Sequence, residues 1–252
     1  MPLDIVDLRN FYASPLGEVT GRVLTSVIRN HWPSARGQIM LGIGFATPYL
    51  DMFRAEADRV LAVMPDVQGV LNWPADGDSA TVLASTAALP FADASIDAAL
   101  IVHALETEDS PRAMLAELWR VLTPGGSVII VVPNRRGLWA RMDTTPFGYG
   151  QPYSRRQINE LLRNALFSPA KWTEALYFPP LSRPTFLKSA SALELIGSNL
   201  GLPFSGVHVI AATKLLYRPL LVRETARQKT RLRPLLVPSA SPRLDEIPER
   251  SH

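Results

Sequence analysis

Residues 39–46 read Ile-Met-Leu-Gly-Ile-Gly-Phe-Ala, a short apolar run followed by a turn with two glycines. The run predicts a buried strand over residues 39–41, and the turn over residues 42–46 leads into a predicted helix over residues 48–57. A Gly-x-Gly turn between a strand and a helix lets backbone N–H groups approach a ligand without interference from a Cβ atom. The same pattern is also typical of a plain strand-to-helix turn.

Further apolar runs follow along the chain. They predict strands over residues 59–63, 81–84, 96–102 and 127–132, with a helix over residues 111–122 that ends before a glycine pair. Continuous apolar strands separated by helices are typical of a parallel sheet that is buried on both faces. The predicted fold class is therefore α/β, a Rossmann-like, doubly wound, mostly parallel sheet with helices on both faces. Ligands of such folds bind at the carboxyl ends of the strands.

The chain divides into three predicted parts. Residues 1–36 form an N-terminal helical cap, with an amphipathic helix over residues 17–32. Residues 37–217 form the α/β domain, in which the irregular segment at about 135–190 is the expected substrate or lid segment. Residues 218–252 form a basic, proline-rich tail that we expect to be flexible.

Three local signals organise the second half of the α/β domain. Ser154 and Gln157 have the spacing of a capping box, which predicts the start of a helix. A second helix is predicted over residues 189–200. The β-rich residues 206–213 predict a strand that closes one edge of the sheet.

Composition sets broad limits on function. The 252 residues include no cysteine, which excludes disulfides, thiol nucleophiles and cysteine-ligated metal clusters. The first residues lack a basic segment followed by an apolar one, so we expect no signal peptide. No run of about 18 apolar residues occurs, so we expect no transmembrane segment and a cytoplasmic location.

The formal net charge of +3 is concentrated near the end of the chain. Residues 214–233 hold seven basic residues and one acidic residue, and the sequence Arg-Pro-Leu-Leu-Val occurs at residues 218–222 and again at 233–237. This 218–237 repeat is either a chance similarity in a tail or a docking motif for a protein partner or an anionic membrane surface.

Two downstream segments carry a family resemblance. Residues 88–97 (ALPFADASID) and 115–127 (LAELWRVLTPGGS) resemble segments that precede the fourth and fifth strands of class I S-adenosylmethionine-dependent methyltransferases of the type 11 group. The resemblance covers residues 39–134. It implies that the cofactor is S-adenosyl-L-methionine and that a methyl group is transferred to an oxygen or nitrogen atom of a small or medium-sized acceptor.

The resemblance also implies a set of cofactor-binding residues at the strand ends, which are Gly42, Ile43, Gly44, Ala46, Met64, Asp66, Ser85, Ala87 and His103. Three acids of the family pattern are replaced here, by Met40, Met64 and Ser85. A charge-assisted hydrogen bond contributes about 1.5–3 kcal/mol, so two losses would cost about 3–6 kcal/mol of binding free energy. Asp66, two residues after Met64, is either a substitute ligand for the ribose or an exposed turn carboxylate.

His103 is the candidate catalytic residue. It follows the predicted strand over residues 96–102, where the family places residues beside the methyl donor. A histidine side chain suits proton transfer near neutral pH, although a histidine that merely packs in the cleft is the alternative. Glu106 is interpreted as a helix-start carboxylate. The four histidines lack metal-ligand spacing, so no metal site is predicted.

Two other function classes compete with a methyltransferase. Loss of the three acids favours a catalytically inactive, methyltransferase-like binding module that works through a protein partner. A nicotinamide-dependent reductase is disfavoured, because Thr47 stands where that fingerprint needs a third glycine and no Tyr-x-x-x-Lys pair occurs. The Asn/Asp-Pro-Pro-Tyr/Phe motif of nucleic-acid amino methylation is missing after residue 102, so we expect no nucleic-acid partner.

Overall fold

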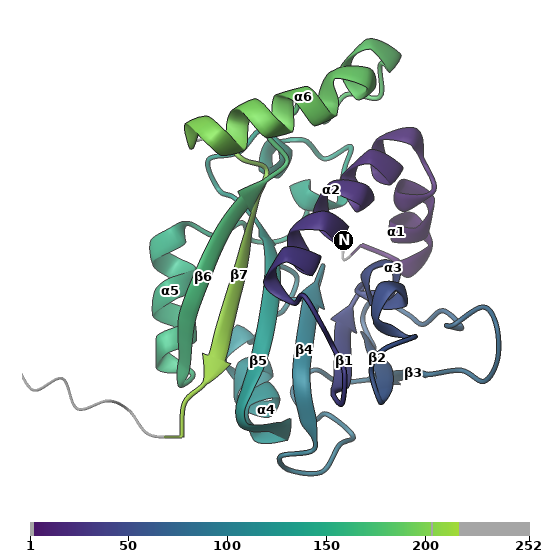
Figure 1. Ribbon diagram of the computed structural model, residues 1–252, viewed down its shortest axis with the longest axis vertical. Coiled ribbons are helices and arrows are strands. Elements are labelled where there is room, and N and C mark those ends of the chain that lie inside the picture. Colours follow the sequence, from purple (N-terminus) through teal and green to yellow (C-terminus); the bar gives the residue numbers. More distant parts are fainter. Residues whose placement is uncertain (1–2, 203, 217–252) are drawn as a thin grey trace, which may run out of the picture. The chain divides into compact units, whose positions relative to one another are not determined.

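A seven-stranded sheet in the order β3-β2-β1-β4-β5-β7-β6 forms the centre of the computed structural model, which describes residues 3–202 and 204–216 (Figure 1). The strands are β1 (Ile39–Gly44), β2 (Arg59–Pro65), β3 (Thr81–Ala84), β4 (Ile96–Val102), β5 (Leu122–Pro133), β6 (Phe167–Ala175) and β7 (Val207–Lys214). The first five are parallel, whereas β7 is antiparallel to both of its neighbours. This confirms the predicted mostly parallel, Rossmann-like sheet. The 218–237 repeat lies outside the described residues.

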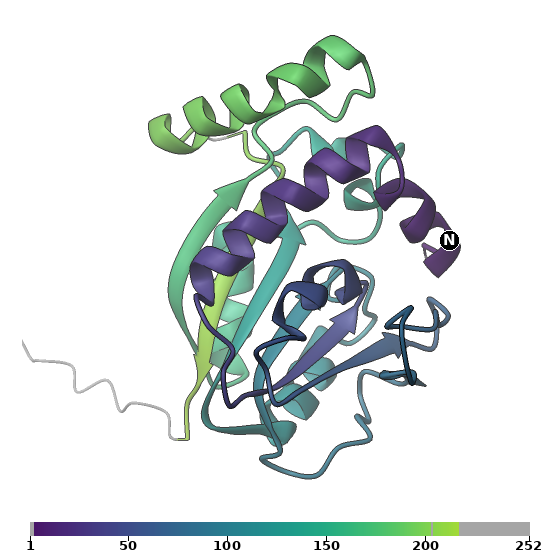
Figure 2. The same ribbon diagram turned by 45° about the vertical axis from the view of Figure 1, so that its right-hand side comes forward.

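Helices cover both faces of the sheet, as Figures 1 and 2 show. They are α1 (Ile5–Tyr12), α2 (Pro15–His31), α3 (Thr47–Leu50), α4 (Pro111–Val121), α5 (Arg155–Asn164) and α6 (Pro184–Leu200), with short 3₁₀ helices at Asp51–Phe53, Trp139–Arg141 and Pro146–Gly148. The core on one face packs α2 and α3 against the strands, and the core on the other packs α4 and α5. No helix of the described residues is long and apolar enough to cross a membrane.

The central strands explain why their sequences are apolar throughout. In β4, Leu100 contacts the core on the α2 side, and its neighbour Ile101 contacts the core on the α4 side. Successive side chains of a strand point to opposite faces, so a strand covered on both faces needs apolar residues at every position. The apolar runs therefore predicted these strands and their burial on both faces of the sheet.

Several sequence-based boundaries need correction. The helix expected over residues 48–57 ends at Leu50 and continues only as a 3₁₀ turn, and α6 begins at Pro184 instead of residue 189. Strand β5 begins at Leu122 and runs through the glycine pair that was expected to end the preceding unit. Strand β7 does not close the edge, because β6 pairs outside it.

The edge strand β6 was missed because its pattern is only half apolar. Lys171 is exposed, and Pro169 lies where the register with β7 shifts. Proline cannot donate a ladder hydrogen bond, so it is tolerated at edges and irregularities. Such a sequence does not resemble the buried strands from which the sheet was predicted.

The capping box at α5 is confirmed and gives a stability prediction. The Ser154 hydroxyl accepts from the Gln157 N–H, and the Gln157 side chain accepts from the Ser154 N–H. We expect Ser154→Ala to lower the free energy of unfolding by about 1 kcal/mol, because orphan N–H groups at the helix start lose a partner. Urea unfolding measures this. The matched control is Ser198→Ala on α6, expected to change stability by less than about 0.5 kcal/mol; equal losses would contradict the prediction.

His31, at the end of α2, gives a pH-dependence prediction. Its Nε2 atom lies 2.9 Å from the Thr173 hydroxyl, and burial, with a smaller contribution from the Lys171 ammonium, lowers the pKa of His31 from 6.5 to about 4. Between pH 6.5 and 4, His31 is therefore protonated in the unfolded chain but not in the folded chain. The free energy of unfolding consequently falls as the pH falls. Because the ring is partly solvated, we expect His31→Gln to reduce this loss by only about 1 kcal/mol. Unfolding at pH 7 and pH 4.5 measures it, and identical pH profiles would exclude His31 as the cause.

Candidate functional site

The glycine turn lies where the strand order reverses, between β1 and β4. Gly44 pairs in register with Val102, and the Phe45 N–H donates to the Val102 carbonyl at 2.8 Å. Gly44 has a φ of +80°, and a Cβ atom there would collide with the Val102 carbonyl. A Cβ atom at Gly42 would crowd Leu50 of α3. Both glycines are thus required by close packing of the turn, independently of any ligand.

Helix α1 lies across the carboxyl ends of β1 and β2. Its residues Ile5 and Leu8 pack against Phe45 of the glycine turn and Met64 of β2, and all four side chains are buried. The Ile5 N–H donates to the Gln68 carbonyl at 2.9 Å, in the loop after β2. The space above these two strand ends is therefore filled by apolar side chains of the chain itself.

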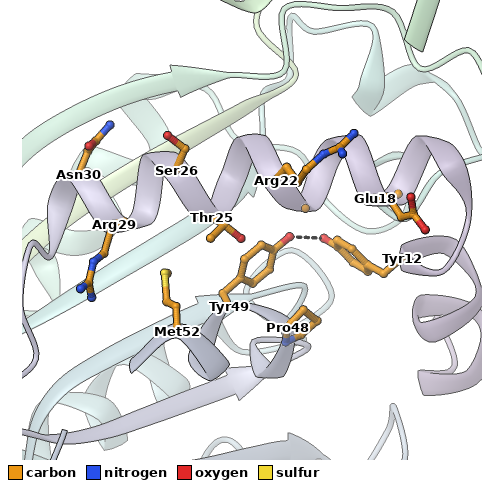
Figure 3. Close-up of a pocket in the computed structure, with 12 residues that line it drawn as sticks. Tyr12, Glu18, Arg22, Thr25, Ser26, Arg29, Asn30, Pro48, Tyr49 and Met52 are labelled. Atoms are coloured by element: carbon orange, nitrogen blue, oxygen red, sulfur yellow. Dashed lines mark hydrogen bonds between the residues drawn. The ribbon is translucent and has the colours of Figure 1, made fainter. Parts of the chain in front are cut away.

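Tyr12, the last residue of α1, connects this helix to His103, which directly follows β4. Its ring stacks on Phe45 with centroids 5.2 Å apart, and its hydroxyl lies 2.9 Å from Nε2 of His103. The Tyr49 hydroxyl of α3 donates to the Tyr12 hydroxyl at 2.8 Å (Figure 3). Burial, more than the neighbouring Tyr49 and Glu106, raises the pKa of Tyr12. Tyr12 therefore stays a neutral phenol, and its hydroxyl can donate to Nε2 of His103 when Nδ1 carries the imidazole proton.

His103 is the centre of a buried polar cluster at the end of β4. It has a left-handed φ of +52°, and its Nδ1 atom lies 3.2 Å from Oε1 of Glu106. The Gln68 amide donates to the His103 carbonyl. With Nδ1 as the donor to Glu106, Nε2 accepts from Tyr12, so both ring nitrogens have partners. This arrangement, an oriented imidazole with one acceptor nitrogen, is that of a general base.

The predicted site residues fall into two groups. Met64 packs against Leu8 of α1, and His103 lies against Tyr12 at the end of α1. Both are buried, as are Gly42, Ile43, Gly44 and Ala46 of the turn. Asp66, Ser85 and Ala87 are exposed instead. The Asp66 carboxylate accepts from the adjacent Val67 N–H, and the Ser85 hydroxyl accepts from the Ala87 N–H, so these polar groups serve local turns.

Sequence reasoning missed four contributors to the site, which are Tyr12, Phe45, Gln68 and Glu106 as a partner of His103. Glu106 is not a helix-start carboxylate, because α4 begins at Pro111 and the Glu106 side chain is buried against the imidazole. A signal was available only for Glu106, three residues after His103. The contacts of Tyr12 and Gln68 depend on tertiary packing.

A groove of about 770 Å³ lies beside this cluster, between α2 and α3. Figure 3 shows the hydroxyls of Tyr12 and Tyr49 facing α2, with Arg22 and Thr25 on the opposite wall. The groove and the polar cluster therefore meet at the two tyrosine hydroxyls.

S-adenosylmethionine does not fit the strand ends in this arrangement. The glycine turn lies where the strand order reverses, which is where open α/β sheets bind their ligands, but the buried side chains of Leu8 and Met64 fill these strand ends. Two buried oxygens, Oε1 of Gln68 and Oε2 of Glu106, have no hydrogen-bond partner among the described residues. Buried polar groups that could bind a ligand are thus present in Gln68 and Glu106, whereas side chains of α1 fill the adjacent strand ends.

Comparisons with known proteins agree with the fold. Residues 39–130 match the family model described as methyltransferase domain. The chain is 27% identical over 158 residues to an uncharacterised protein of Methanocaldococcus jannaschii, covering 60% of this chain and 73% of that protein. It is 33% identical over 125 residues to an uncharacterised methyltransferase of Mycobacterium avium, covering 48% of this chain and 49% of that protein. The chain therefore spans about half the length of the second relative.

A solved structure with the same fold is the 1,6-didemethyltoxoflavin-N1-methyltransferase of Burkholderia thailandensis, with bound 1,6-didemethyltoxoflavin and S-adenosylhomocysteine. Its TM-score is 0.52 at 18% identity, and the match covers 83% of this chain and 81% of that chain. This likeness concerns the fold. Together with the match of residues 39–130 to the methyltransferase domain model, this shared fold is what the chain has in common with class I S-adenosylmethionine-dependent methyltransferases.

Proposed function

We propose that the chain transfers a methyl group from S-adenosylmethionine to an oxygen or nitrogen atom of a small or medium-sized acceptor. The observation that carries this proposal is the family match over residues 39–130, which includes the glycine turn at the reversal of strand order. Open α/β sheets bind their ligands at this point. The proposed cofactor-binding residues remain those named from the sequence: Gly42, Ile43, Gly44, Ala46, Met64, Asp66, Ser85, Ala87 and His103.

His103 is the proposed base for the acceptor. Its Nδ1 atom is held by Glu106, and its Nε2 atom faces a hydroxyl group, that of Tyr12, in a buried environment. An acceptor hydroxyl or amine in the place of the Tyr12 hydroxyl would give its proton to Nε2. This geometry favours O- or N-methylation, in which the acceptor atom loses a proton.

The second candidate function is a binding module without catalysis. Met64 favours it, because a buried thioether stands where the family has a ribose-binding acid, and its sulfur accepts the Leu71 N–H at 3.1 Å. The exposed Asp66 carboxylate is engaged in its own turn. The two functions differ in whether the nucleoside binds at all.

Titration of the full chain with S-adenosylhomocysteine distinguishes these two functions. We expect a dissociation constant between about 10 µM and 1 mM, weaker than for a preformed site because ligand binding must displace α1. Isothermal calorimetry measures it, and mass spectrometry of co-purifying small molecules gives an independent reading. If neither this chain nor variants with weakened α1 contacts bind at millimolar concentration, the methyltransferase proposal is overturned and the binding module is favoured.

The role of His103 is tested by His103→Asn, since asparagine tolerates the left-handed backbone at this position. We expect methyl transfer from labelled S-adenosylmethionine to a small-molecule extract to fall about 100-fold or more, although S-adenosylhomocysteine is still bound. The matched control is His208→Asn on β7, a buried histidine beside Glu174, which should leave the transfer rate unchanged. Equal methyl-transfer rates in wild type and His103→Asn would show that His103 is not the base.

A further inference from the structure

Helix α1 is attached to the domain by a small set of contacts. It has eight residues, and isolated helices shorter than about 12 residues are marginal in water, so its docking depends on the tertiary contacts of Ile5, Leu8, Phe11 and Tyr12. An element of this kind opens at a lower free energy than the core of the sheet. The structure therefore places a separable element directly over the strand ends.

Two buried polar atoms near α1 lack hydrogen-bond partners within the part of the chain that the structure describes. Gln68 Oε1 and Glu106 Oε2 are buried without a hydrogen-bond partner among the described residues, and both side chains belong to the His103 cluster. Buried polar atoms in native proteins are normally paired, so unpaired ones call for a specific explanation. A closed state that leaves two such oxygens unpaired is less stable than one in which water or a polar ligand reaches them.

Tyr12 of α1 contacts both the glycine turn and the His103 cluster. Its ring covers Phe45 of the glycine turn, and its hydroxyl takes the acceptor nitrogen of His103. While Tyr12 is docked, both the space for a nucleoside and the free nitrogen of the proposed base are blocked. Release of one helix would restore both.

We propose that α1 is an autoinhibitory cover, which fills the cofactor space of the family with its own side chains and must leave before S-adenosylmethionine binds. The inference rests on the proposed function, because a cover matters only where a ligand enters beneath it. The apparent affinity then equals the affinity of the open site reduced by the fraction of molecules that are open. Contacts of α1 with the strand ends set that fraction.

A reversible lock tests the cover in the full chain. The Ile5 Cβ atom lies 3.9 Å from the position of a Cβ atom at Gly69, within the range of a disulfide, and the chain has no cysteine of its own. In Ile5→Cys/Gly69→Cys, oxidation should weaken S-adenosylhomocysteine binding at least about tenfold, and reduction should restore it. Gly69 has a φ of +89°, so cysteine is strained there. Gly69→Cys alone carries the same strain without an intramolecular bridge and is the control.

Tyr12→Phe tests the same proposal without a bridge or backbone strain. It removes the hydroxyl that bonds His103 and Tyr49 and keeps the ring on Phe45. We expect S-adenosylhomocysteine to bind about three- to tenfold more tightly, because the open fraction rises. The matched control is Tyr177→Phe, next to α6, which should leave the affinity unchanged.

The outcomes separate the two proposals. Equal affinity in the oxidised and reduced lock, together with an unchanged affinity in Tyr12→Phe, would overturn the cover and leave the methyltransferase proposal intact. Binding that appears only in the reduced lock or in Tyr12→Phe supports both. Failure of wild type, reduced lock and Tyr12→Phe alike to bind would overturn the methyltransferase proposal, and the cover with it.

Discussion

The close approach of β1 to β4 is the constraint on which the site depends. Gly44 reaches this position only in a left-handed conformation, with its backbone against the Val102 carbonyl. The side chain of the next residue, Phe45, therefore lies over the strand ends, where its ring stacks on that of Tyr12. His103 directly follows Val102 and turns through its own left-handed conformation. One backbone contact thus places the aromatic surface, the imidazole and the end of α1.

The same contact shows why a glycine pattern is an ambiguous signal of ligand binding. Gly42 and Gly44 are needed for packing against Leu50 and Val102, whatever binds above them. Polar side chains are more informative, since they lose hydration when buried and need partners. Here the buried polar side chains are Gln68, His103 and Glu106, and each has an atom committed to a neighbour in the cluster. The chemistry of the site is therefore set by this cluster more than by the turn.

Much of the sheet could be predicted because its strands are buried on both faces and so carry a continuous apolar signal. The helix at Ser154 was equally readable, since a capping box is a local arrangement. The role of α1 was not readable, although Ile5, Leu8 and Tyr12 lie on one helical face. Their partners, Phe45 and Met64, lie far away in the sequence and are brought under α1 only by the folded sheet.

Met64 shows, for a single residue, what could not be predicted from the sequence. From the sequence it reads as a lost carboxylate, and its substitution indicates weaker cofactor binding. The structure gives the thioether another role, as part of an apolar cluster with Leu8 and as an acceptor for the Leu71 N–H. A pattern of missing acids cannot show that a helix has come to lie above them.

The antiparallel strand β7 has a practical consequence for work on this site. It pairs Val207 with Pro133 and Thr213 with Ser127, so Lys214 lies near the amino end of β5, whereas the glycine turn lies at the carboxyl ends of the parallel strands. The Lys214 ammonium is fixed there by the Leu122 carbonyl and the Trp119 ring. A fluorophore attached at the exposed Leu216 would lie far from the glycine turn and leave it undisturbed, whereas one at the buried Leu3 would disturb the docking of α1.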